Sequence, residues 1–251
     1  MTLSRRMLLR RRYIGDVIEF IAYGGHGRSF TSQRRVRLSD ADEHGSLRPD
    51  GVARYLQDVA TDDWDDTGVA SDDTWLVRRT AWRVAASGRQ PRLGELVTMT
   101  TWCAGTGAAW AERRTNLTVG AQTLLEAAAL WVPVDASGHP RRIRPEFYEL
   151  YGEATNGRRV PGRVVTPDVA EDATRRPWPL RRSDLDVVGH VNNAAVWHAL
   201  SEVAKGDLTF ASITHHGAIE GDDDVTLAHT PTQLWLLVNG ELRVSGEFRL
   251  D

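Results

Sequence analysis

The feature that most restricts the fold of this chain is a repeat of its own sequence. When residues 37–60 are aligned without gaps on residues 181–204, nine of the 24 residue pairs are identical. Average residue usage would give roughly two identities by chance. Because the two copies lie 144 residues apart, the repeat indicates a duplicated domain rather than a solenoid of short units.

Both copies predict the same order of local structure. A short strand leads into an acidic loop, and the loop leads into a helix with one buried face, because apolar residues recur at the i, i+3, i+4, i+7 spacing. In the first copy this stripe consists of Val52, Tyr55, Leu56, Val59 and Ala60. In the second copy it consists of Val196, Ala199, Leu200, Val203 and Ala204.

Strand-like segments follow each predicted helix and end at turns rich in Gly, Pro or Asn. In the first half they cover residues 74–86, 96–104, 108–120 and 123–135. In the second half they cover residues 207–216, 223–229, 232–239 and 242–250, with Asn239-Gly240 as a hairpin turn. One helix against one antiparallel sheet in each half predicts a layered α+β core.

These patterns divide the chain into two domains and a linker. We expect an N-terminal domain over residues 31–150 and a C-terminal domain over residues 177–251. Residues 151–176 are rich in Gly, Pro, Arg and acidic residues, which is typical of a surface linker. Residues 1–30 are expected to be a flexible extension, unless the start codon has been assigned too far upstream.

Composition excludes several classes of protein. A formal net charge of -3 argues against nonspecific nucleic-acid binding. Cys103 is the single cysteine, so neither an intrachain disulfide nor a Cys-rich zinc site can form. No apolar run approaches the ~20 residues of a membrane span. We therefore expect a cytoplasmic protein without membrane contact, metal or cofactor.

The segment from Leu180 to Lys205 concentrates polar groups ahead of the second predicted helix. Two carboxylates, one imidazole and two amides occur there within ten residues: Asp184, Asp186, His190, Asn192 and Asn193. A carboxylate can activate water or attack a carbonyl carbon. Backbone N–H groups at a helix start can stabilise a developing oxyanion. This loop, the second corner, is therefore predicted to be a catalytic site.

Four segments of the chain resemble the acyl-acyl-carrier-protein thioesterases of bacteria and plants. They are residues 46–62, 89–114, 130–152 and 181–203, the last containing the Asp-Leu-Asp…His-Val-Asn-Asn motif. The resemblance implies a double hotdog fold, in which each half is a long helix wrapped by an antiparallel sheet. It also implies hydrolysis of a fatty acyl thioester to free fatty acid and carrier thiol, in fatty acid biosynthesis.

The resemblance also assigns roles to residues of the second corner. Asp186 is expected to be the general base or nucleophile and His190 its orienting or proton-relay partner, with Glu220 as a helper. Gly189 would let the backbone approach a ligand closely, and Asn192 and Asn193 would bind substrate or cap the helix. Plant members carry Asn at the position of Val188, and this difference leaves any asparagine-dependent step in doubt.

Structural alternatives stay open at this stage. An Asp in such a loop often does no more than accept hydrogen bonds from the amides of its own turn. The first corner, with Asp40, Asp42 and His44, has Ser46 at the position of His190 and is predicted to be structural. The first half is predicted to supply walls of the acyl-chain pocket instead.

The partner of the reaction is expected to be acyl carrier protein or, alternatively, CoA. The basic cluster Arg141, Arg142 and Arg144 would steer an acidic carrier or its phosphopantetheine phosphate, unless it is only a solvated surface. A non-catalytic acyl-binding protein of the same fold is the third alternative. Because one chain already holds two copies of the domain, we expect a monomer or a homodimer.

Overall fold

A single ten-stranded antiparallel sheet forms the body of the protein in the computed structural model, which describes residues 18–69, 74–162 and 164–251. The strand order is β1-β3-β4-β5-β2-β7-β10-β9-β8-β6. The first-half strands are β1 Ser29–Arg35, β2 Thr74–Val84, β3 Leu96–Thr106, β4 Ala111–Val119 and β5 Gln122–Val134. The second-half strands are β6 Thr174–Pro177, β7 Leu208–His215, β8 Val225–His229, β9 Gln233–Val238 and β10 Glu241–Leu250.

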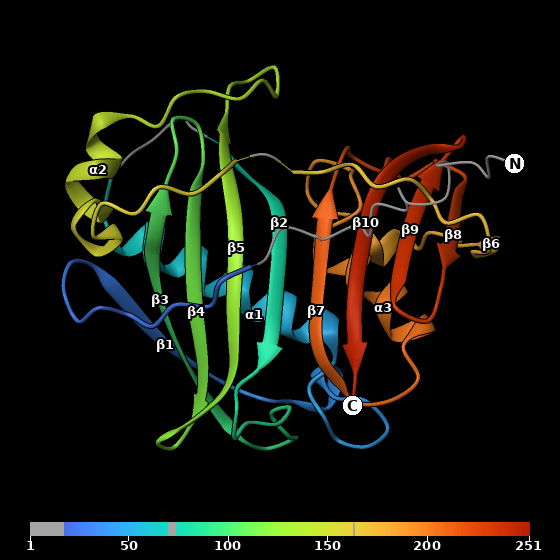
Figure 1. Ribbon diagram of the computed structural model, residues 1–251, viewed down its shortest axis with the longest axis horizontal. Helices are drawn as coiled ribbons and strands as arrows, with labels where there is room; N and C mark the ends of the chain where they lie inside the picture. The colour runs from blue at the N-terminus through green and yellow to red at the C-terminus, as the bar shows by residue number, and fades with distance from the viewer. Residues whose placement is uncertain (1–17, 70–73, 163) are drawn as a thin grey trace, which may run out of the picture.

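The two halves of the sheet meet at strands β2 and β7, which pair antiparallel with Arg79 opposite Thr214. Helices α1 (Pro49–Asp66) and α3 (His198–Val203) lie on one face of the sheet, behind it in Figure 1. Across the same junction Trp82 of β2 stacks on Trp197 with ring centroids 6.4 Å apart. The two halves therefore share one continuous apolar core.

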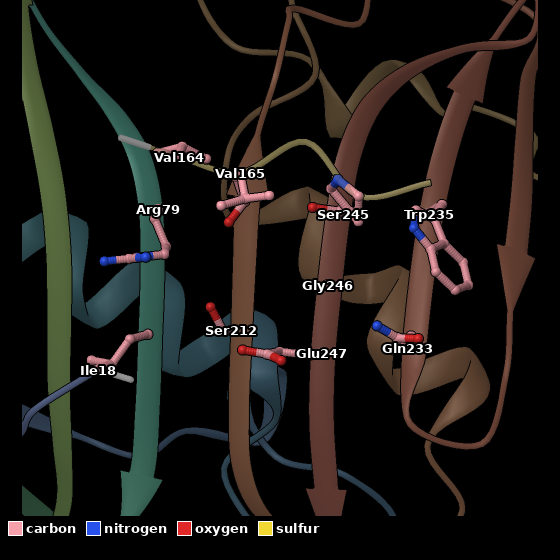
Figure 2. Close-up of a pocket in the computed structure, with 12 residues that line it drawn as sticks. Ile18, Arg79, Val164, Val165, Ser212, Gln233, Trp235, Ser245, Gly246 and Glu247 are labelled. Atoms are coloured by element: carbon pink, nitrogen blue, oxygen red, sulfur yellow. The ribbon is translucent and has the colours of Figure 1, made fainter. Parts of the chain in front are cut away.

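The opposite face of the sheet is crossed by the segment that joins the halves, coloured yellow in Figure 1. It leaves the helix α2 (Pro145–Tyr151) and ends in the edge strand β6. A shallow groove beneath it is lined by Val164, Val165 and side chains of β2, β7, β9 and β10 (Figure 2). Within the described residues, no helix is long and apolar enough to cross a membrane.

Helix α1 has the structure that its sequence predicts. Pro49 occupies the first turn, where its missing N–H has no cost. All five residues of the predicted apolar stripe are at most 9% exposed. The strand predictions are confirmed by β2 to β5 and β7 to β10. The Asn239-Gly240 turn is confirmed as well, since both of its residues have positive φ, 50° and 82°.

The prediction of a long helix in the second half is wrong. Helix α3 covers six residues, and the 3-10 turn Ala195–Trp197 (η4) precedes it. Gly206, whose φ of 144° suits few residues other than glycine, follows shortly after its end. In the first copy the helix continues past the equivalent position through residues 61–66, so α1 is 18 residues long. The strand expected immediately before the second corner instead lies earlier, at β6.

Candidate active site

The second corner is built on a tight turn closed by Asp186. Its Oδ1 accepts hydrogen bonds from the backbone N–H groups of Val188, at 3.0 Å, and His190, at 3.1 Å. The N–H of Asp186 donates to the carbonyl of His190 at 2.8 Å. Gly189 has a φ of 88°, which requires a residue without a side chain. One carboxylate oxygen therefore has the structural role that the sequence left open.

The second carboxylate oxygen of Asp186 has a different environment. Within the described part of the chain, Oδ2 accepts no hydrogen bond. The neighbouring residues Val187 and Val188 are 103% and 68% exposed, so the turn projects into solvent. Oδ2 is thus available to a water molecule or a substrate while Oδ1 fixes the orientation of the group.

His190 and Glu220 are brought together from two separate loops. The Nε2 atom of His190 lies 3.3 Å from Oε1 of Glu220, and their backbones form an isolated antiparallel bridge. The N–H of Val191 donates to the carbonyl of Ile219 at 2.8 Å, which fixes the same contact. A carboxylate in this position orients the imidazole ring.

The helix start offers fewer free amides than the sequence suggests. Asn192 Oδ1 accepts a hydrogen bond from the N–H of Ala194 at 2.8 Å, so Asn192 closes a turn just ahead of η4. The N–H groups of Gly189, Val191 and Asn192 are bonded to backbone carbonyls. Among the described residues at the helix start, the N–H groups of Asn193 and Ala195 make no hydrogen bond and are left as oxyanion donors.

The first corner repeats this geometry with different chemistry. Oδ1 of Asp42 accepts hydrogen bonds from the N–H groups of His44, at 2.9 Å, and Ser46, at 2.8 Å. Ser46 and Arg92 form the backbone bridge that corresponds to the one between His190 and Glu220. The turn is therefore kept while the imidazole and the carboxylate are absent, and its structural role stays a prediction.

An apolar cavity of about 230 Å³ lies in the first half of the molecule. It is lined by Ala60, Thr61, Trp64, Trp75, Cys103, Ala111, Arg113, Trp131 and Phe147. These residues come from α1, α2 and four strands, and no sequence pattern could have grouped them. Burial raises the pKa of the Cys103 thiol to about 11, so this thiol is not a nucleophile at neutral pH.

Beside the cavity lies a buried charged cluster that the sequence did not predict. Asp63, whose side chain is 1% exposed, pairs with Arg28 Nε at 2.8 Å and with a guanidinium nitrogen of Arg113 at 2.6 Å. The hydroxyl of Tyr151 donates to Asp63 at 3.0 Å. Burial and the nearby carboxylate raise the pKa of Tyr151 to about 12. This cluster joins α1, β4 and α2 around one wall of the cavity.

The predicted arginine cluster is not part of the corner. Arg141, Arg142 and Arg144 lie between β5 and α2, in the first half, whereas Glu220 follows β7 in the second half. Arg141 and Arg142 are exposed, and Arg144 precedes the first turn of α2 and is partly buried. The cluster therefore remains a candidate surface for a carrier.

Comparison with known proteins decides the family. Residues 27–151 match the model of the acyl-ACP thioesterase N-terminal domain, where ACP is acyl carrier protein. An uncharacterized protein of Mycobacterium tuberculosis is 32% identical over 179 residues, which cover 70% of each chain. The chain belongs to the acyl-ACP thioesterase family. Family membership makes it a thiolester hydrolase, as the sequence resemblance implied.

Solved structures of thioesterases have the same fold as this one. The 12:0-ACP thioesterase from Umbellularia californica superposes with a TM-score of 0.73 at 17% identity, covering 91% of this chain and all of the other. An acyl-ACP thioesterase from Bacteroides thetaiotaomicron superposes with a TM-score of 0.70 at 13% identity, covering 88% and 96%. The predicted α+β hotdog class is thereby supported for this thioesterase.

Proposed function

We propose that the second corner of this thioesterase hydrolyses a fatty acyl thioester of ACP to free fatty acid and carrier thiol, in cytoplasmic fatty acid biosynthesis. The observation that carries the proposal is the contact between His190 and Glu220, in a member of this family. Asp186 lies in the same corner and uses only its Oδ1 atom to hold the turn. Neither metal nor cofactor is part of the proposed reaction.

The fold proposed for this reaction is a tandem hotdog. Each half contributes five strands, and the corners at Asp42 and Asp186 make equivalent hydrogen bonds. We keep the domains at residues 31–150 and 177–251 with the linker at 151–176, although β6 begins at Thr174. Residues 1–17 of the expected N-terminal extension lie outside the described residues. The proposed assembly is a monomer or a homodimer.

In the proposed mechanism Oδ2 of Asp186 takes a proton from water as the water oxygen attacks the acyl carbonyl carbon. The carbonyl oxygen becomes an oxyanion, which the N–H groups of Asn193 and Ala195 stabilise. When the carbon–sulfur bond breaks, protonated His190, held by Glu220, gives its proton to the leaving sulfur. Proton return from Asp186 to His190 then restores the site.

The acyl chain is proposed to occupy the apolar cavity of the first half. Trp64, Trp75 and Trp131 give it walls that are mostly apolar. We expect Ala60→Leu, which adds bulk inside the cavity, to shift the preferred acyl chain to a shorter length. Trp64→Ala, which enlarges the cavity, should shift it to a longer length. Turnover of a series of acyl-ACP substrates measures both shifts, and unchanged profiles in both variants would place the chain elsewhere.

The carrier is proposed to be ACP, docked with help from the exposed Arg142. We expect kcat/KM to be higher for acyl-ACP than for the matched acyl-CoA. Arg142→Glu should raise KM for acyl-ACP several-fold at low salt and leave kcat unchanged, because a surface charge mainly affects encounter. Arg175→Glu, on edge strand β6, is the control. Equal kcat/KM values for the two carriers would favour an acyl-CoA thioesterase.

A second candidate function is acyl binding without turnover. Two structural observations support it: Oδ1 of Asp186 holds the turn, and most amides of the loop are bonded within the protein. A sequence difference also supports it, since Val188 occupies the position of the Asn in plant members of the family. This candidate predicts tight binding of an acyl thioester with no release of thiol.

A further inference from the structure

A β-bulge lies at the junction between the two halves of the sheet. In β2 the pairing with β5 shifts register between Val77 and Arg79, so Arg78 is the additional residue of the bulge. Arg79 itself lies on the outer face of the sheet, in the groove shown in Figure 2. Bulges frequently redirect a side chain next to a functional site.

The bulge places Arg78 beside the end of β7. Arg79 is opposite Thr214 in the antiparallel ladder, so the next position along it brings Arg78 alongside His215. His215 shares its face of β7 with the core residue Ile213, two positions earlier. Burial lowers the pKa of both His215 and His216, and the positive charge of the nearby Arg78 lowers both further.

Arg78 is a half-buried cation without a neutralising partner. Among the described residues it makes no ion pair or hydrogen bond, and burial alone lowers its pKa. Other partly buried arginines of the chain do pair with carboxylates, for example Arg48 with Asp50 and Arg113 with Asp63. A desolvated charge without a partner is costly, so a partner from outside the chain would stabilise it.

His215 adds an unmet hydrogen-bonding group at the same place. Its side chain belongs to a residue that is 9% exposed, and its Nε2 has no partner among the described residues. Burial lowers the pKa of His215 to about 4, so the imidazole is neutral at pH 7. A neutral imidazole can donate a hydrogen bond from Nε2 to an anionic oxygen, next to the positive charge of Arg78.

We propose that Arg78 and His215 form an anion site at the adjoining ends of β2 and β7, which takes the oxygen atoms of a carboxylate or a phosphate group from the thioesterase's ligand. The inference rests on the proposed function for the identity of that ligand. The bound carboxylate would be that of the fatty acid product, or the bound phosphate would be that of the phosphopantetheine arm of the carrier.

The location of the anion site relative to the corner agrees with either source. The loop after His215 carries Ile219 and Glu220, which hold Val191 and His190 in the second corner. Five residue steps span at most about 18 Å of extended chain. The anion site and the proposed reacting groups therefore lie within the length of one acyl-pantetheine ligand.

The test measures binding rather than turnover. Calorimetry with decanoate, inorganic phosphate and uncharged decanol is carried out on the full chain and on Arg78→Gln. We expect at least about tenfold weaker binding of one anion in Arg78→Gln, with partial recovery in Arg78→Lys and no change for decanol. A loss confined to decanoate assigns the site to the product carboxylate, and a loss confined to phosphate assigns it to the carrier arm.

Two further variants keep the test decisive. Arg83→Gln is the control, because Arg83 lies on the same strand but is paired with Glu126, and it should bind like the unmodified protein. His215→Phe should weaken the same anion, and it carries the test if Arg78→Gln does not fold. The inference would be overturned if every variant bound both anions as tightly as the unmodified protein does. It would also be overturned if the unmodified protein bound neither anion. Loss of thioester hydrolysis with intact anion binding would instead refute the proposed function alone.

Discussion

Asp186→Asn is expected to lower kcat at least about 100-fold and to leave the melting temperature unchanged. The amide oxygen of Asn can still accept the two hydrogen bonds from Val188 and His190, so the turn persists. The variant loses only the basic carboxylate, and general base catalysis contributes typically 10²–10⁴-fold. Thiol release from acyl-ACP and thermal unfolding, measured on the same preparation, report the two quantities.

The first corner supplies a matched control for this experiment. Asp42 accepts the same pair of backbone hydrogen bonds in its own turn. The residue equivalent to His190 in this turn is Ser46, which has no imidazole. Asp42→Asn should therefore retain full activity. If both variants were fully active, Asp186 would be a structural residue of the turn and would have no part in the chemistry.

Asp50→Ala is expected to reduce the free energy of unfolding by about 3–5 kcal/mol, the usual cost of removing one partner of a buried ion pair. The side chain of Asp50 is fully buried at the start of α1 and accepts hydrogen bonds from Arg48 and Arg54, at 2.9 and 2.5 Å. His198, from the second half, lies 3.3 Å away. Denaturant unfolding measures the effect. Asp62→Ala, on the exposed face of α1, should change the stability by less than about 0.5 kcal/mol.

The pH dependence of stability checks the same assignment. Hydrogen bonds from His198 and the two arginines outweigh burial and hold the pKa of Asp50 well below its ordinary value of 3.8. A carboxylate with a lowered folded-state pKa adds stability that is complete above its unfolded-state pKa and is lost as the pH falls below it. The unmodified protein should therefore lose stability below about pH 4 more steeply than Asp50→Ala does. Parallel curves would show that Asp50 is not the group responsible.

The elements of the fold that follow local periodicity could be predicted from the sequence. The stripe from Val52 to Ala60 specifies α1, and the Asn239-Gly240 turn specifies the last hairpin. The length of α3 could not be predicted from its stripe, because the same spacing extends past the residue where the helix ends. Gly206 was the available signal, and its effect depends on a backbone angle that spacing does not reveal.

The candidate site could be predicted only in part, for a related reason. Residues close in sequence, such as Asp186 and His190, were grouped by their polar character ahead of a helix. The contact of His190 with Glu220 depends on how the loop after β7 returns to the corner. The register shift that isolates Arg78 depends on the pairing of strands distant in sequence. Such features arise from tertiary structure and leave no local pattern.

The most direct test of the central claim is a single-turnover reaction with the protein in excess over acyl-ACP, in which bound thioester, free thiol and free fatty acid are all quantified. We expect thiol and fatty acid to appear together, in equal amounts and at the same rate, as the thioester disappears. Stable binding of the thioester with no release of either product would contradict it, and the protein would then be an acyl-binding member of the family.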